Sequence, residues 1–374
     1  MEDARDFVGV LATCSPHMTN ISGRTRYQDL RDKLVATPRT WLVTGAAGFI
    51  GSHLVQELLG LGQRVVGLDN FSTGYQHNLD EAVAAHPDTS GSFRFVEGDI
   101  RDLDACRAAC NGVEYVLHQA ALASVPRSIA DPVSSTQVNV DGFLNVLVAA
   151  RDASARRVVY ASSSSVYGDA TTIPQVEGST GEVLSPYAAT KAVNEMYAKV
   201  FQRTYGLETV GLRYFNVFGP RQDPDGAYAA VIPRWTARLL KDVPCEIFGN
   251  GDTSRDFCYV ANAVQANLLG ATTTSDGSTA QAYNVACGEE TSLNDLFRMM
   301  RSSLAAFQPS VEFAEPVYSE ERQGDIRRSL ADIGKARRLL GYAPTHRADA
   351  GLEEALHWYA GQLLALNSEA TAAS

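Results

Sequence analysis

The chain has 374 residues, a formal net charge of −11 and 45% hydrophobic residues, so it can bury one large core or two smaller ones. The acidic balance argues against nucleic acid or an anionic membrane as the main ligand. No apolar run is long enough to span a bilayer, and the first residues are acidic where a secretory signal is basic, so we expect a cytoplasmic protein. Neither the six cysteines nor the seven histidines show a ligand-like spacing, and we expect no metal site.

The first elements are expected after a disordered tail over residues 1–24. Helical periodicity covers Arg26–Leu34, and a short apolar strand, Trp41–Val43, runs into Gly45-x-x-Gly48-x-x-Gly51 and a further helix. The first glycine permits a tight turn, the second lets the backbone approach a pyrophosphate, and the third allows close packing of helix on strand. With a strand before it and a helix after it, this loop predicts a dinucleotide site.

Two further strands end in carboxylates. Arg64–Leu68 is followed by Asp69, where this kind of fold places an acid on the adenosine ribose, and no arginine follows directly. A carboxylate there repels a ribose phosphate, so NAD is favoured over NADP. The strand Phe93–Val96 leads to Asp99, which either takes the adenine amino group or caps the helix beginning near Asp102.

Strands and helices then alternate, as a parallel sheet with crossover helices requires. We expect strands at Val113–His118, Arg157–Ala161, Glu208–Arg213 and near Tyr283–Val285, and helices at Pro132–Arg151, Tyr187–Tyr205, near Ile232–Lys241, and short ones around Ser292, Asp332 and Leu352. The fold class is therefore α/β: a Rossmann-type doubly wound parallel sheet with a smaller α/β substrate-binding lobe. We assign residues 25–215, with returning segments near 256–290, to the NAD-binding domain, and residues 216–255 and 291–366 to the lobe.

Two motifs carry chemistry. Tyr187 and Lys191 are spaced to share one helix face, where an ammonium beside the phenol favours its ionised form and makes it a proton acceptor. Alone, the pair could be an exposed aromatic with a solvated lysine. The serine run over residues 162–165 leaves the end of the fifth strand, where hydroxyls can donate to or accept from a sugar; a serine-rich turn is the alternative.

Together these motifs, with Arg213-Tyr-Phe-Asn-Val-Phe-Gly-Pro220, resemble the extended short-chain dehydrogenase/reductases over residues 26–360. The stretches 119–128 and 221–224 resemble more closely the UDP-N-acetylglucosamine 4-epimerases of bacterial surface-polysaccharide (lipopolysaccharide) pathways. The resemblance implies tightly bound NAD, a UDP-sugar substrate, reversible C4 epimerisation through a 4-keto sugar, and a homodimer formed through the helices at 132–151 and 187–205.

The resemblance also implies roles for individual residues. Tyr187 is the base, Ser163 holds the C4 oxygen, and Lys191 holds the nicotinamide ribose and lowers the pKa of the tyrosine. The implied cofactor-binding residues are Gly45, Ala47, Gly48, Phe49, Ile50, Gly51, Asp69, Asn70, Phe71, Ser72, Gly74, Asp99, Ile100, Gln119, Ala120, Ala121, Tyr187, Lys191, Tyr214 and Val217. The implied substrate-binding residues are Ser124, Ser163, Ser164, Ser165, Tyr187, Asn216, Gln222, Ala230, Val231, Glu246, Phe248, Arg255, Arg322, Asp325 and Ser329.

Among these, Arg255 and Arg322 match positions that clasp the diphosphate, as guanidinium forks suit phosphate oxygens; each could otherwise be a solvated surface charge. Asp325 matches a uridine-ribose ligand, with Asn216 on the phosphate side.

At a few positions this sequence differs from the enzymes it resembles, and these differences bear on which substrate it uses. Enzymes restricted to glucose and galactose commonly carry tyrosine where this chain has Ser329, which leaves room for an N-acetyl group. Ala123 stands where relatives tend to have glycine, which leaves open whether UDP-N-acetylglucosamine or its uronic acid is the better substrate. A UDP-glucose or UDP-glucuronate 4-epimerase is the further alternative within this class. Ser164 and Ser165 replace the acids of related dehydratases and decarboxylases. A non-catalytic NAD-binding regulator is the alternative from another class, and the intact Ser163, Tyr187 and Lys191 count against it.

Overall fold

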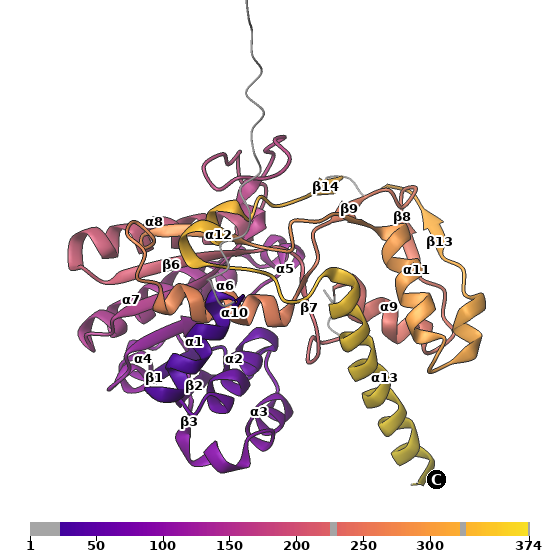
Figure 1. Cartoon of the computed structure of the whole chain (residues 1–374). Helices are drawn as coiled ribbons and strands as arrows, with labels where there is room; N and C mark the ends of the chain where they lie inside the picture. Colours follow the sequence, from indigo (N-terminus) through magenta and orange to yellow (C-terminus); the bar gives the residue numbers. More distant parts are fainter. Residues whose placement is uncertain (1–22, 225–229, 322–326, 373–374) are drawn as a thin grey trace, which may run out of the picture.

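The computed structural model describes residues 23–224, 230–321 and 327–372. Its centre is a seven-stranded sheet, all parallel, in the order β11-β6-β5-β4-β1-β2-β3 (Figure 1). The strands are β1 (Thr40–Thr44), β2 (Arg64–Asp69), β3 (Phe93–Glu97), β4 (Tyr115–His118), β5 (Arg157–Ser163), β6 (Glu208–Tyr214) and β11 (Gln281–Val285). The inner strands are mostly apolar and buried because helices cover both faces of the sheet. The predicted Rossmann-type fold is confirmed.

Helices cover each face of the sheet and enclose a core. One core lies between the sheet and α1 (Arg26–Ala36), α2 (Phe49–Gly60), α3 (Gln76–Ala84), α10 (Val260–Thr272) and α12 (Gly334–Leu340). The opposite core lies under α4 (Leu103–Cys110), α7 (Gly142–Asp152) and α8 (Pro186–Tyr205). The short helices α5 (Val125–Ala130) and α6 (Pro132–Thr136) precede α7 and contact α8.

A third core belongs to the part of the chain drawn to the right of the sheet in Figure 1. There α9 (Val231–Leu239), α11 (Leu293–Leu304) and α13 (Ala348–Ala372) pack around Trp235, Phe297 and Tyr359. Short strands complete this region: β7 (Val217–Phe218) with β10 (Cys258–Tyr259), β8 (Glu246–Phe248) with β13 (Val317–Ser319), and β9 (Ser254–Arg255) with β12 (Thr291–Ser292) and β14 (Arg328–Ser329). The domain limits drawn from the sequence stay a prediction, and the expected tail falls almost wholly outside the described residues.

Three predicted helices differ from the structure. The expected helix over 132–151 is interrupted at Gln137–Asp141 by wider π-helical turns, which direct the buried Asn139 amide toward the Leu122 backbone and the Thr190 hydroxyl. The expected short helix around Leu352 is the first part of the 25-residue α13. The short helix expected around Ser292 is the 12-residue α11. Ser292 is the N-cap of this helix, which begins at Leu293. Within the described ranges, no helix has the length and apolar character needed to cross a membrane.

Candidate active site

The glycine loop joins β1 to α2 as the sequence predicts. Gly45 has a φ of +68°, a left-handed conformation that glycine adopts without strain. A Cβ at Gly51 would lie 1.9 Å from the Gly45 carbonyl oxygen, so only glycine permits this packing of helix on turn. Gly48 is the N-cap of α2, and no side chain caps that helix. The first turn of α2 therefore presents backbone donors and a positive dipole end to a phosphate group.

The carboxylate of Asp69 organises the loop around the adenosine end. Its two oxygens accept hydrogen bonds from the backbone N–H groups of Ala47 (2.9 Å) and Phe71 (2.8 Å). Burial is the main influence on this carboxyl and raises its pKa. Asp99 pairs with Arg101 at 2.7 Å and accepts a hydrogen bond from the Asn70 amide. The N-cap of the next helix, α4, is Asp102, so the alternative that Asp99 caps this helix is wrong.

A pocket of about 610 Å³ lies along the carboxyl ends of the strands, where open parallel sheets bind ligands. Most of the residues expected to bind cofactor line it: Gly45, Gly48, Phe49, Ile50, Gly51, Asp69, Asn70, Ser72, Asp99, Ile100, Gln119, Ala120, Ala121, Tyr187, Lys191, Tyr214 and Val217. Ala47, Phe71 and Gly74 are not in the lining. Residues in the lining that we did not predict include Arg101, Leu122, Ser134 and Val138; Leu122 lies within the stretch 119–128 singled out above, and no motif marks the other three in the sequence.

Ser163, Tyr187 and Lys191 meet at one end of this pocket. Ser163 ends β5, and its hydroxyl accepts from the Ser165 backbone N–H at 3.1 Å and contacts the Ser165 hydroxyl at 3.0 Å. Tyr187 and Lys191 share a face of α8, with the Lys191 ammonium 5.8 Å from the Tyr187 ring centre. That ammonium donates to the Ala161 carbonyl at 2.9 Å. The three groups predicted to act together are therefore brought together.

The pKa of Tyr187 is raised in the structure, whereas we expected Lys191 to lower it. Burial raises the pKa of Tyr187, and the nearby Ser163 hydroxyl partly offsets this effect. Burial also lowers the pKa of Lys191 to about 8. The structure therefore does not show the expected lowering of the Tyr187 pKa by Lys191: the Lys191 ammonium donates to the Ala161 carbonyl, and burial of the phenol has the larger effect.

A buried ion pair fixes the catalytic face of α8 on the sheet. Glu195, one turn after Lys191, accepts two hydrogen bonds from the Arg213 guanidinium at 2.9 and 2.8 Å, and both side chains are at most 8% exposed. The same carboxylate accepts from the Ser162 hydroxyl at 2.7 Å. Because Ser162 precedes Ser163 on β5 and Arg213 lies on β6, this network sets the distance between the serine and the tyrosine helix.

Fewer of the expected substrate-binding residues than of the expected cofactor-binding residues line this pocket. Ser163, Tyr187, Asn216 and Gln222 line the pocket. Arg255 and Ser329 are partners in the register of β9 and β14, and Ser329 is 7% exposed. The structure does not bring Ser124, Ser164, Ser165, Ala230, Val231, Glu246, Phe248, Arg255 and Ser329 into the lining of this pocket, and Arg322 and Asp325 lie outside the described residues.

This arrangement defines a dinucleotide-dependent enzyme whose fold and reactive groups are those of a sugar-nucleotide oxidoreductase or isomerase. The model of the NAD dependent epimerase/dehydratase family matches residues 41–286. The chain belongs to this family.

Several relatives and solved structures within this family are 4-epimerases of UDP-sugars. A UDP-glucose 4-epimerase of Mycolicibacterium smegmatis is 38% identical over 320 residues, which cover 85% of this chain and 97% of that protein. A UDP-N-acetylglucosamine 4-epimerase from Methanobrevibacter ruminantium M1, solved with UDP-N-acetylmuramic acid, has a TM-score of 0.79 at 37% identity and covers 87% of this chain and 99% of that one. A UDP-glucuronic acid 4-epimerase mutant from Bacillus cereus, solved with NAD and a fluorinated substrate analogue, has a TM-score of 0.76 at 30% identity, with 87% and 99% covered.

NAD is the cofactor of this protein, as predicted, and the residues present fit it. The uncapped α2 N-terminus suits the pyrophosphate, and the Asp69 carboxylate at the end of β2 suits unphosphorylated ribose hydroxyls. The same pocket reaches the three candidate catalytic groups.

Proposed function

We propose that the protein is a UDP-sugar 4-epimerase that interconverts UDP-N-acetylglucosamine and UDP-N-acetylgalactosamine. The observation that carries this proposal is the meeting of Ser163, Tyr187 and Lys191 at one end of the NAD pocket, with Ser164 and Ser165 in place of a carboxylate after the catalytic serine. Family membership, and relatives that are UDP-sugar 4-epimerases, support the reaction class.

The proposed chemistry assigns each group an atom. NAD, when bound, would supply the acceptor for the hydride of the sugar C4 and the donor of the hydride to the opposite face of the turned 4-keto sugar. Tyr187 removes the proton from the C4 hydroxyl and later returns it. Ser163 holds that oxygen with its hydroxyl, which is already oriented by the Ser165 backbone N–H. Lys191 holds the nicotinamide ribose and, through its positive charge, stabilises the phenolate once the pocket is filled.

We propose that dehydration is not the reaction. Loss of a hydroxyl from C6 needs an acid to protonate the leaving group and a base to take the C5 proton. Hydroxyls follow Ser163 instead: the Ser165 hydroxyl lies 3.0 Å from Ser163, where a dehydratase carries an acid. A serine hydroxyl can hold a sugar oxygen but cannot supply a proton at neutral pH.

The turning of the 4-keto sugar requires an anchor that stays bound. We propose that Arg255, Arg322, Asp325 and Asn216 hold the UDP part, with Ala230, Val231, Glu246, Phe248 and Gln222 completing its site. The pairing of β9 with β14 supports this arrangement, because it places Arg255 beside Ser329. A residue that limits the sugar at C2 would then lie next to a residue that holds the diphosphate.

A comparison of UDP-sugars tests the proposal. Purified protein should convert UDP-N-acetylgalactosamine into its C4 epimer faster than it converts UDP-galactose, UDP-glucuronate or the uronic acid of the acetylated sugar. Faster turnover of a uronic or unacetylated sugar would replace the proposed substrate within the same reaction. No interconversion of any of them, with NAD bound, would favour a non-catalytic NAD-binding regulator.

We further propose a homodimer formed through the face made by α5, α6 and α8. Ile129, Val133, Met196 and Val200 expose 63, 65, 61 and 53% of their surface on these helices, which is unusual for large apolar residues without a partner. Light scattering of the wild type and of Met196→Glu tests this, and a wild-type protein that stays monomeric contradicts it.

A further inference from the structure

We propose that Asn267, in the middle of α10, is a positioning residue for the nicotinamide end of the NAD pocket. Its side-chain amide donates to the Tyr214 hydroxyl at 2.7 Å. That hydroxyl donates to the Gln119 amide oxygen at 3.1 Å, and the Gln119 amide nitrogen donates back to the Asn267 oxygen at 3.0 Å. The three side chains form a closed ring in which each donates once and accepts once. The inference rests on NAD as the cofactor and on the proposed catalytic residues.

The ring spans the strand that carries the catalytic serine. Gln119 directly follows β4 and Tyr214 ends β6, and both line the pocket. Between them runs β5, whose Ser163 is the register partner of Tyr214 and whose Ala161 carbonyl accepts from Lys191. Asn267 therefore joins the two walls that flank the end of β5, from the side of the sheet opposite to α8.

The polar groups of the ring are used within the protein. Asn267 is 0% exposed, and its second amide hydrogen goes to the Ala263 carbonyl at 2.8 Å. Since the Tyr214 hydroxyl gives its single hydrogen to Gln119, it is not available as a donor to a ligand. Tyr214 and Gln119 then shape the pocket through ring and backbone surfaces whose orientation depends on Asn267. Hydrogen bonds in such a ring strengthen one another, and each unpaired member costs free energy when buried.

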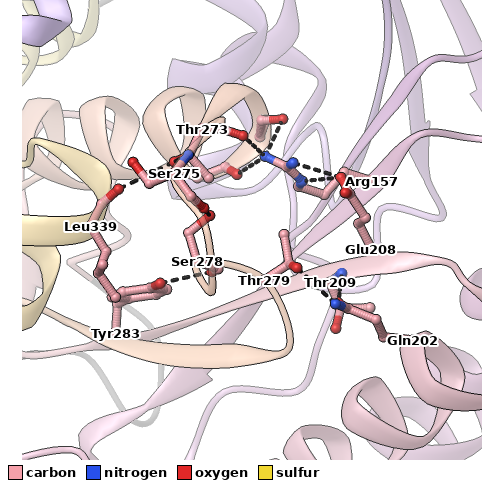
Figure 2. A network of polar contacts seen from close by, with 12 residues as sticks. Arg157, Gln202, Glu208, Thr209, Thr273, Ser275, Ser278, Thr279, Tyr283 and Leu339 are labelled. Carbon is pink, nitrogen blue, oxygen red and sulfur yellow. Dashed lines mark hydrogen bonds and ion pairs between the residues drawn. The ribbon is translucent and has the colours of Figure 1, made fainter.

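The helix that carries Asn267 is also held at its C-terminus. At the C-terminus of α10, the buried Arg157 guanidinium donates to the carbonyls of Gly270, Ala271 and Thr273 at 2.9 to 3.0 Å and pairs with Glu208 at 2.6 Å (Figure 2). Arg157 and Glu208 begin β5 and β6. The second half of α10 is thus held twice, by Arg157 at its C-terminus and, about one turn earlier, by the Asn267 ring, and of these two contacts the ring is the one made with pocket-lining residues.

Removal of the amide should act on cofactor retention rather than on stability alone. In Asn267→Ala, Tyr214 and Gln119 lose their shared partner and the two pocket walls can move independently. We expect NAD to leave the purified holoenzyme at least tenfold faster than from the wild type. We also expect kcat to fall while the KM for the UDP-sugar changes less than twofold, because no hydrogen bond of the ring goes to those proposed UDP-binding residues that the structure describes.

The matched control is Gln265→Ala on the same helix. Gln265 is as buried as Asn267, and its amide makes two hydrogen bonds at 2.8 and 2.9 Å, both to the backbone of Ala343, away from the pocket. The variant Gln265→Ala should lower the melting temperature as Asn267→Ala does, but its rate of NAD loss should stay within twofold of the wild type. Tyr214→Phe opens the ring while keeping the aromatic volume, and it replaces Asn267→Ala if that variant is not recovered.

NAD loss is measured by desalting the holoenzyme at intervals and assaying the NAD that remains per chain. Faster loss in Asn267→Ala than in Gln265→Ala at equal loss of melting temperature supports the positioning role. Equal rates in the two variants overturn it. Because this readout needs no UDP-sugar, it stands or falls separately from the proposed epimerase activity, which fails only if the wild type with NAD bound turns over no substrate.

Discussion

Replacement of Lys191 by methionine should make the NAD-free protein more stable and the enzyme inactive. The Lys191 side chain is 3% exposed, and burial lowers its pKa from 10.5 to about 8. The difference between these values corresponds to about 3 kcal/mol that the folded state loses at pH 7 by keeping the ammonium charged. Methionine removes that cost but leaves the Ala161 carbonyl without its donor, which costs about 1–3 kcal/mol. The expected net gain at pH 7 is about 1 kcal/mol.

The pH dependence is the sharper signature of this buried charge. A lysine whose pKa is lower in the folded state loses its proton there first, so the stability of the wild type rises as pH increases from about 8 to 10.5. Lys191→Met lacks this rise. The difference in free energy of unfolding between variant and wild type should therefore shift by about 2–3 kcal/mol in favour of the wild type between pH 7 and pH 10. All other titrating groups are shared, so they cancel in the difference.

Urea unfolding of both NAD-free proteins at several pH values measures this difference, and a turnover assay at pH 7 with NAD present measures the loss of function. Lys335→Met is the control: Lys335 is half-buried on α12, also has a lowered pKa, and donates to Gln281 and Ala282. Its turnover should stay within twofold of the wild type, whereas Lys191→Met should lose at least a hundredfold. A free-energy difference that does not change with pH would refute the assignment of an uncompensated buried charge to Lys191.

Three further variants and titrations test the proposed roles. Tyr187→Phe should retain NAD while turnover falls by about 10²- to 10⁴-fold, because the proton acceptor is gone; turnover near that of the wild type would remove Tyr187 from the mechanism. Ser329→Tyr should shift the ratio of kcat/KM values toward UDP-galactose and away from UDP-N-acetylgalactosamine, and an unchanged ratio would exclude Ser329 as the residue that selects the sugar. The pKa of Tyr187, raised by burial in the NAD-free protein, should fall when oxidised NAD binds, since a positive charge favours the phenolate. Phenolate absorbance of wild type and Tyr187→Phe, titrated with and without NAD, measures this shift, and equal titrations would contradict it.

The parts of the fold that the sequence predicts well are those with a strong local cause. The strand before Gly45 is apolar because it is buried on both faces, and the glycine spacing admits few other structures. Tyr187 and Lys191 share a helix face by spacing alone, and the structure confirms that both line the pocket. For these residues the local pattern and the tertiary environment agree, so reasoning from the chain is sufficient.

The helix α10 was not predicted because burial removes its periodicity. Eleven of its 13 residues, Val260 and every residue from Asn262 through Ala271, are buried, and a helix that is buried around its whole circumference has no amphipathic pattern. The three amides at Asn262, Gln265 and Asn267 were the available signal. Each stands among apolar neighbours; Asn262 and Gln265 hydrogen-bond the segment 343–346, and Asn267 hydrogen-bonds Gln119. Which segment each one binds depends on the path of the whole chain and cannot be read from local sequence.

The pKa of Tyr187 also depends on the path of the whole chain and cannot be read from local sequence. Helical spacing places an ammonium near the phenol, but it does not fix where the ammonium points. Here the Ala161 carbonyl at the end of β5 takes it, and burial then dominates the titration of both groups. Because Ser163 ends β5 and Lys191 donates to the Ala161 carbonyl of the same strand, the orientation of that strand end determines, in the proposed mechanism, how the base is activated. The ring of Gln119, Asn267 and Tyr214 flanks this strand end, so we expect these three side chains to influence the proposed proton transfer indirectly.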